Sequence, residues 1–215
     1  MENLKILSMN LGMGFVPIRD KKKKEILREK LEEDYDIILL QGNNISLNLD
    51  DSKYKTITDN NKTVTLLKKE FANFKSGPTG VSLQNNLIVY YGNRPLVVMN
   101  VNCKQIANFK SVVEGISEYS DKDSPYYVRS KIIAGRFPEG ANITGFCEKF
   151  GLKDLSSTVG QGFHEEYGRK RLNHFFISDN LECREFYKLV GLVEYSKAFE
   201  AYPMEAEIGY QKVLK

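Results

Sequence analysis

The sequence predicts an α/β protein in which two mostly antiparallel sheets pack face to face and carry helices on their outer surfaces. Strand-like runs outnumber helix-like runs, and several are so close in sequence that antiparallel pairing is expected. Residues 91–95 are expected to form a turn between two such strands, because Gly92 and Pro95 interrupt regular structure. A doubly wound parallel sheet would instead alternate strands and helices along the chain.

The strands are predicted from short runs rich in apolar and β-branched residues. They are expected over residues 4–9, 36–40, 54–57, 63–68, 80–91, 96–101, 131–138, 171–178, 192–199 and 205–214. Amphipathic periodicity predicts a helix over residues 106–119 and a short further element over 140–150.

A third helix is predicted over residues 20–33, with Asp20 as its N-cap. Its inward-facing residues are expected to be Ile26, Leu27 and Leu31. Four consecutive lysines, Lys21 to Lys24, occupy its first turn, where the helix dipole disfavours positive charge. They form either a solvated helix face or, in the sharper interpretation, a patch for a polyanion.

Length and composition indicate one domain over residues 1–215. The chain has 215 residues, of which 41% are hydrophobic, which is enough for one substantial core. The net charge of +3 allows a polyanionic partner without requiring one, because 28 acidic residues offset 31 basic ones.

No run of about 18 apolar residues is present, so no membrane partner is expected. The first residues do not resemble a secretory signal, and a cytoplasmic location is predicted. The three cysteines, Cys103, Cys147 and Cys183, are far apart and form no CxxC pair. This spacing argues against zinc and against a disulfide framework, and predicts reduced thiols.

The order and spacing of five strand-like segments resemble the endonuclease/exonuclease/phosphatase family, which includes pancreatic deoxyribonuclease, abasic-site endonucleases and inositol-phosphate phosphatases. The segments are residues 4–10, 36–42, 96–102, 131–138 and 171–178. The resemblance extends from Lys5 to about Val213. It implies a four-layer α-β-β-α sandwich of two mixed sheets, with the family's site at its top.

The first two segments differ from the family at the position of the metal ligand. In the family the first segment ends in Asn, and this chain keeps that residue as Asn10. The second segment of the family ends in Leu-Gln-Glu, and its Glu is the principal Mg²⁺ ligand. This chain reads Leu40-Gln41-Gly42. Mg²⁺ needs one or two carboxylates to compete with water, and glycine has no side-chain oxygen. The change predicts loss of productive metal binding.

The third and fourth segments lose residues that act on the phosphate. Asn102 replaces a His, and an amide can donate to a phosphate but cannot carry a proton through a reaction cycle. The family's Gly-Asp-Phe-Asn reads Gly135-Arg136-Phe137-Pro138 here. Arg136 reverses the charge of the acid and cannot serve as a base.

The last two signatures also depart from the family. Asn173 stands where an Asp is usual, and the following His174 is expected to face away from the site because neighbours in a strand alternate. His164 matches no family position and is expected to be exposed. The closing Ser-Asp-His signature, followed by a small residue and Pro, has no Asp or His in residues 201–208. The closest fit puts Met204 and Glu205 at the Asp-His pair.

The leading hypothesis is therefore a non-catalytic binding or regulatory protein that keeps the scaffold. Its pocket would be lined by Asn10, Asn102, Arg136 and Asn173 and would contain no catalytic residue and no metal. Such a pocket suits phosphate or carboxylate, so a phosphate-containing ligand or nucleic acid is predicted, and a protein partner stays open.

Two alternatives remain at this point. A divergent metal-dependent phosphodiesterase or nuclease would need Mg²⁺ on relocated carboxylates, with Glu139, Glu205 and Glu207 converging within about 4–5 Å of one ion. In a simpler use, Glu139 or Glu205 neutralises Arg136. The other alternative is a structural or protein-interaction subunit with a vestigial pocket. The basic residues at 21–24 and 169–171 support nucleic acid only if they flank the pocket mouth.

Overall fold

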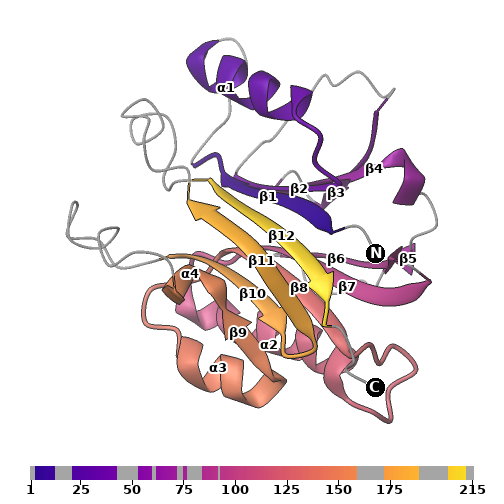
Figure 1. Cartoon of the computed structure of the whole chain (residues 1–215). Helices are drawn as coiled ribbons and strands as arrows, with labels where there is room; N and C mark the ends of the chain where they lie inside the picture. The colour runs from indigo at the N-terminus through magenta and orange to yellow at the C-terminus, as the bar shows by residue number, and fades with distance from the viewer. Residues whose placement is uncertain are drawn as a thin grey trace.

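A computed structural model of the chain describes residues 3–12, 21–42, 53–59, 62–71, 75–76, 84–91, 93–158, 172–188 and 203–211. Two six-stranded sheets of these residues face each other, with helices on both outer surfaces (Figure 1). The expected α-β-β-α sandwich is confirmed. Within the described residues, no helix has the length and apolar character needed to cross a membrane.

The first sheet has the order β11-β12-β1-β2-β4-β3. Its strands are β1 (Leu4–Asn10), β2 (Ile37–Gln41), β3 (Tyr54–Asp59), β4 (Thr63–Lys68), β11 (Leu181–Lys188) and β12 (Met204–Tyr210). Only β1 and β2 pair in parallel, because helix α1 (Lys21–Glu32) connects them on the outer face. Ile26 and Leu27 of α1 are buried against that face and Leu31 is partly buried, as predicted.

The second sheet has the order β5-β6-β7-β8-β10-β9. Its strands are β5 (Lys75–Ser76), β6 (Gln84–Tyr91), β7 (Arg94–Asn102), β8 (Ser130–Arg136), β9 (Leu152–Asp154) and β10 (Asn173–Ser178). Here β7 and β8 are the parallel pair, joined through η2 (Ile106–Asn108) and α2 (Phe109–Ser120). The remaining helical segments are η1 (Lys69–Phe71), α3 (Ile143–Phe150) and α4 (Leu155–Thr158).

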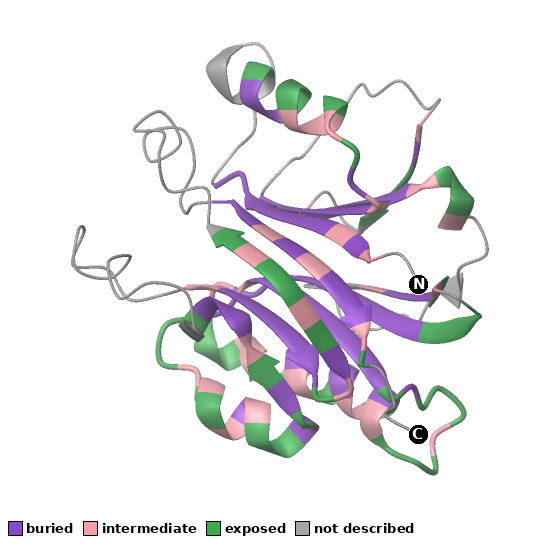
Figure 2. Cartoon of the chain, viewed as in Figure 1, coloured by how far each residue is buried: buried purple, intermediate pink, exposed green. Residues whose placement is uncertain are grey.

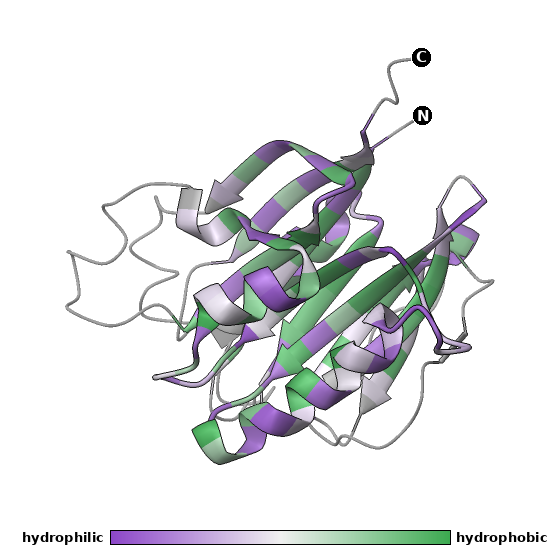
Figure 3. Cartoon of the chain, turned by 90° about the horizontal axis from the view of Figure 1, so that it is seen from below, coloured by the Kyte–Doolittle hydropathy of each residue, from purple (hydrophilic) through white to green (hydrophobic). Residues whose placement is uncertain are grey.

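Three apolar clusters hold the four layers together. In β1, Leu4 and Ile6 belong to the cluster between the sheets, whereas Leu7 and Met9 belong to the cluster under α1. A third cluster lies between the second sheet and the helices α2 and α3. Figure 3 shows the chain from the side of these helices. Since both faces of the central strands are covered, these strands are buried nearly throughout (Figure 2).

The main difference from the sequence-based elements is β11, which was not predicted. Among the described strands it pairs with β12 alone, has a register shift between Cys183 and Glu185, and exposes polar residues along one face. An edge strand of this kind lacks the apolar run by which the other strands are recognised. The predicted N-cap Asp20, the side chains of the lysine run, and the predicted strand at 192–199 lie outside the described residues.

Candidate functional site

The ends of four strands from both sheets meet at one edge of the sandwich. In the second sheet Asn102 of β7 lies directly opposite Arg136 of β8, and Arg136 lies opposite Asn173 of β10. Residues paired across neighbouring strands lie on the same face, so the three side chains form a row. From the first sheet, Asn10 Nδ2 donates to Asn173 Oδ1 at 3.1 Å. We call Asn10, Asn102, Arg136 and Asn173 the strand-end site.

Gly135 fixes Arg136 in this row. Its φ is +135°, and a Cβ built on it would lie 2.0 Å from the carbonyl oxygen of Val101. Only glycine allows β7 and β8 to approach so closely. Phe137 then turns to the opposite face, where it is 1% exposed and packs on Phe146 and Phe176. The Gly-Arg-Phe sequence therefore directs Arg136 towards the other sheet.

Asn102 joins the two sheets by bonding to Gly42, the position where the resembling family has its metal-binding Glu. Its Nδ2 donates to the carbonyl oxygens of Gly42 at 3.0 Å and Lys62 at 3.1 Å. These two bonds fix the orientation of the amide, because only the NH₂ group can donate. Asn102 Oδ1 is buried and has no hydrogen-bond partner in the described part of the chain.

Two further amides support the site from below, and the sequence had not assigned them. Gln41 Nε2 donates to Asn100 Oδ1 at 2.8 Å, and Asn100 Nδ2 donates to the carbonyls of Leu40 at 3.1 Å and Val64 at 3.0 Å. Asn100 is 0% and Gln41 1% exposed. Buried polar groups with satisfied hydrogen bonds hold one geometry. The sequence feature that could have identified Gln41 and Asn100 is a polar residue within an otherwise apolar strand.

A second cation, Lys104, lies beside Arg136 and was also missed. Burial lowers the pKa of the Arg136 guanidinium. The pKa of the Lys104 ammonium is also lowered, mainly by burial and to a smaller extent by the positive charge of Arg136. Lys104 Nζ is buried and makes no hydrogen bond to the residues that the structure describes. Its neighbour Cys103 is held to the next strand, since Cys103 N donates to Arg136 O at 2.9 Å.

The described histidine faces away from the strand-end site, as the alternation predicted. His174 Nδ1 lies 2.9 Å from Asp154 Oδ2, and its ring stacks on Phe176 with centroids 5.3 Å apart. Both contacts lie on the outer side of the second sheet, under the helices. His174 is therefore a packed residue of that layer. His164 and residues 169–171 lie outside the described ranges.

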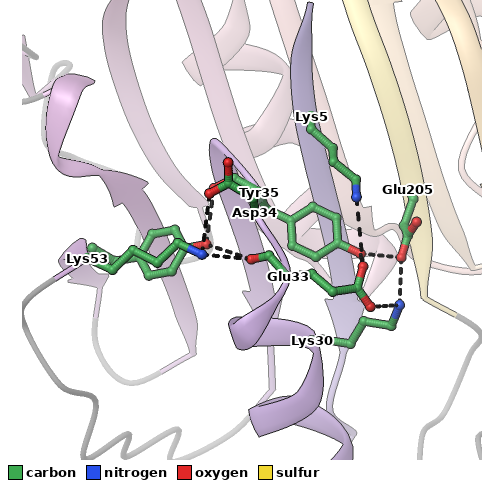
Figure 4. A network of polar contacts seen from close by, with 8 residues as sticks. Lys5, Lys30, Glu33, Asp34, Tyr35, Lys53 and Glu205 are labelled. Carbon is green, nitrogen blue, oxygen red and sulfur yellow. Dashed lines mark hydrogen bonds and ion pairs between the residues drawn. The ribbon is translucent and has the colours of Figure 1, made fainter.

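The glutamates of the relocated metal hypothesis do not come together. Glu205 lies on the outer face of β12, where Lys30 Nζ is 2.9 Å from its Oε1 and Tyr35 donates a hydrogen bond to it (Figure 4). Glu207 follows two residues later on the same face. Glu139 is exposed after β8 in the other sheet. No group of three or more His, Cys, Asp or Glu within the described ranges is placed to hold a metal ion.

The structure also contradicts the expectation that Met204 and Glu205 occupy the positions of the family's Asp-His pair. Met204 is 4% exposed and packs between the sheets, while Glu205 points outward, so neither reaches the strand-end site. The idea that Glu205 neutralises Arg136 is wrong for the same reason. Pro203 directly precedes β12. Aligned on that proline, the signature puts Glu200 and Ala201 at the Asp and His positions, and both lie outside the described residues.

No protein-family model matches the sequence, and no curated protein matches it. Solved structures do match its fold. An endonuclease/exonuclease/phosphatase family protein from Bacteroides thetaiotaomicron has a TM-score of 0.64 at 15% identity, with 98% of each chain covered. The endonuclease domain of TRAS1, a telomere-specific non-LTR retrotransposon, gives 0.64 at 14% identity, over 98% of this chain and all of that one.

The human Nocturnin catalytic domain, in a structure with a bound sulfate anion, has a TM-score of 0.63 at 12% identity, covering 97% of this chain and 95% of that one. At such identities the likeness establishes the fold. It agrees with the resemblance carried by the five strand-like segments, which form β1, β2, β7, β8 and β10. The chain therefore has the DNase I-like fold of the endonuclease/exonuclease/phosphatase proteins.

Proposed function

We propose that this chain is a catalytically degenerate protein of that fold, a cytoplasmic binding or regulatory module whose strand-end site accepts phosphate or a similar oxyanion. One observation carries the proposal: Arg136 lies in register between Asn102 and Asn173, on the face that meets Asn10. A guanidinium stands where the resembling family has an acid.

The chemistry of the row supports an anionic ligand. The guanidinium of Arg136 and the amides of Asn10 and Asn173 offer hydrogen-bond donors in a partly buried place, where a charge-assisted bond is stronger than in water. Asn102 holds the two sheets together there, since its NH₂ group already donates to two carbonyls. The Nocturnin domain, which has the same fold, binds sulfate. The ligand is accordingly a phosphate-containing molecule, with nucleic acid as one member of that class, and a protein partner stays open.

The same residues favour binding without catalysis. Position 42 offers only its backbone, whose carbonyl oxygen already accepts from Asn102. Asn102 and Asn173 cannot carry protons, and Arg136 has no accessible neutral form. The described residues do not favour the divergent Mg²⁺-dependent phosphodiesterase. Glu205 and Glu207 share the outer face of β12 while Glu139 follows β8 in the other sheet, and no described group of three or more His, Cys, Asp or Glu is placed to hold a metal ion.

The absence of catalysis is directly testable. Purified protein is expected to show no Mg²⁺- or Mn²⁺-dependent cleavage of DNA, RNA or a simple phosphodiester, because the acids and bases of the family motifs are replaced. Cleavage is measured with and without chelator, alongside the Arg136→Ala variant. Turnover that requires the metal and disappears in this variant would contradict the proposal and favour the phosphodiesterase.

Binding of phosphate tests the role of Arg136. Arg136→Ala should weaken phosphate binding at least several-fold, because a desolvated charge-assisted hydrogen bond contributes about 1.5–3 kcal/mol. Affinity and melting temperature are measured on the same preparation. Arg28→Ala is the matched control, since the Arg28 side chain is 79% exposed on α1 and pairs with Glu32 across one helical turn. A lower melting temperature with unchanged phosphate affinity would make Arg136 a purely structural residue.

A further inference from the structure

We propose that the strand-end site selects an oxyanion that carries its own proton, such as hydrogen phosphate, over a fully ionised one such as sulfate. The selection is made by a buried donor, Lys104 Nζ, and a buried acceptor, Asn102 Oδ1. The inference rests on the proposed function and identifies the protonation state of its ligand. It also adds Lys104 to the site.

Asn102 and Lys104 reach the strand-end site from one short segment. Asn102 ends β7 in register with Arg136, on the face that meets the first sheet. Cys103 turns to the opposite face, where its side chain belongs to the cluster under the helices. Lys104 follows, and its ammonium lies close enough to Arg136 to be influenced by that charge. The donor and the acceptor therefore lie beside the same residue.

The acceptor has a fixed orientation. Asn102 is 3% exposed, and its NH₂ group donates to the carbonyl oxygens of Gly42 and Lys62. Oδ1 is on the other arm of the planar amide, so it is turned away from these two carbonyls. It cannot exchange places with Nδ2 without the loss of both bonds, because an amide oxygen only accepts. Oδ1 has no hydrogen-bond partner among the described residues.

Lys104 offers the complementary group. Its Nζ is buried and makes no hydrogen bond within the described ranges, and an ammonium only donates. Other lysines differ, since Lys30 contacts two carboxylates and Lys68 contacts three. Because Asn102 Oδ1 is unpaired as well, the two groups do not satisfy each other. A buried polar group without a partner is costly, so a ligand that bonds to both groups is favoured.

Such a ligand must present an acceptor to Lys104 and a donor to Asn102. Hydrogen phosphate does so, because near neutral pH it has charged oxygens and also a P–OH group. Sulfate has the same tetrahedral shape but carries no proton, so it would place an oxygen lone pair against Asn102 Oδ1. A buried water molecule could also bond to both groups, and it would select neither anion. Discrimination between phosphate and sulfate therefore tests the inference.

The affinities for phosphate and sulfate are compared by calorimetry at pH 7 and constant ionic strength. The wild type should bind phosphate at least about tenfold more tightly than sulfate. Charge alone predicts the opposite order, because sulfate is fully ionised at this pH and phosphate is not. Equal affinities, or tighter binding of sulfate, would contradict the inference and leave the proposed function in place. If neither anion binds, the proposed function itself fails.

Two substitutions separate the roles of donor and acceptor. Lys104→Met should weaken the binding of both anions at least several-fold and keep the preference, because the donor serves either anion. Asn102→Ala should abolish the preference. The matched controls are Lys110→Met, at a side chain that is 85% exposed, and Asn108→Ala, at an exposed hydrogen bond to Gln105. Both controls should behave as the wild type. Unchanged phosphate affinity in Lys104→Met, or an unchanged preference in folded Asn102→Ala, would overturn the role of that residue.

Methyl phosphate gives a test that needs no variant, which decides the matter if Asn102→Ala does not fold. Methyl phosphate loses its last proton near about pH 6, whereas inorganic phosphate keeps a proton well above pH 8. Relative to inorganic phosphate, methyl phosphate should therefore bind at least about tenfold more weakly at pH 8 than at pH 5.5. Any titration of the protein itself cancels in this ratio. A ratio that does not change with pH would show that no ligand proton is required.

Discussion

On the outer face of the first sheet, the ammonium of Lys30 lies between the carboxylates of Glu33 and Glu205, at 2.6 and 2.9 Å (Figure 4). At the strand-end site the ammonium of Lys104 lies beside a second cation. Burial alone would lower the pKa of Lys30, but its bonds to Glu33 and Glu205 raise it. For Lys104 both burial and the neighbouring charge lower the pKa.

The difference separates a structural cluster from the proposed binding site. In the outer cluster the charges of the protein balance one another, and Tyr35 adds hydrogen bonds to both carboxylates. This cluster attaches the end of α1 to β12 and needs nothing from outside. At the strand-end site Lys104 Nζ is buried and has no hydrogen-bond partner among the described residues. The proposed anion would provide one.

The largest expected effect comes from breaking the outer cluster. Lys30→Met removes the cation shared by Glu33 and Glu205 and leaves two carboxylates close together. Removing one partner of a largely buried ion pair typically costs about 3–5 kcal/mol. Chemical denaturation should show a loss of this order, with phosphate affinity unchanged in the folded protein. Lys110→Met, at an exposed pair, should change stability by less than about 0.5 kcal/mol. A comparably small effect of Lys30→Met would contradict the structural role.

A smaller effect is expected at Lys131, a buried lysine at the far end of β8 from Arg136. It is 4% exposed, its Nζ donates to Arg129 O at 3.3 Å, and burial lowers its pKa to about 8 despite the attraction of Asp179. Below pH 8 the Lys131 ammonium is charged in the folded protein, and burying this charge destabilises the folded state. Lys131→Met should therefore be more stable than the wild type at pH 7, by at most about 3 kcal/mol.

The advantage of Lys131→Met should shrink as the pH rises from 8 to 10.5. In that window the folded wild type releases the proton while the unfolded chain still binds it, so the stability of the wild type increases with pH relative to the variant. Denaturation at several pH values measures the difference. A constant difference across the window would show that Lys131 does not titrate as described. Phosphate affinity should not change, which distinguishes Lys131 from Lys104.

The sequence predicted the frame of the fold well because buried strands are apolar runs. The strand at 63–68 matches β4 in full, and that at 36–40 differs from β2 by one residue at each end. The edge strand β11 was missed because its exposed face makes it look like a loop. The strand-end residues were found through the resemblance, and the structure brings them to one edge.

Side-chain direction and long-range neighbours were harder to predict. The alternation of Met204, Ala206 and Ile208 on the inner face places Glu205 outside, but only once the start of β12 is known. Lys104 was missed for another reason. Its neighbour Arg136 is 32 residues away, and the pair forms only because α2 returns the chain to lie parallel beside β7. No local pattern carries that information.

The amide of Asn102 also limits how this edge of the sandwich could be changed. It bridges the two sheets through the carbonyls of Gly42 and Lys62, and the resembling family has a histidine and a glutamate at positions 102 and 42. Changing Asn102 to histidine would leave two buried carbonyls without that donor, and such groups are costly. Changing Gly42 to glutamate would place a carboxylate beside an intact amide bridge. Installing the family's residues one at a time is therefore expected to pass through less stable proteins.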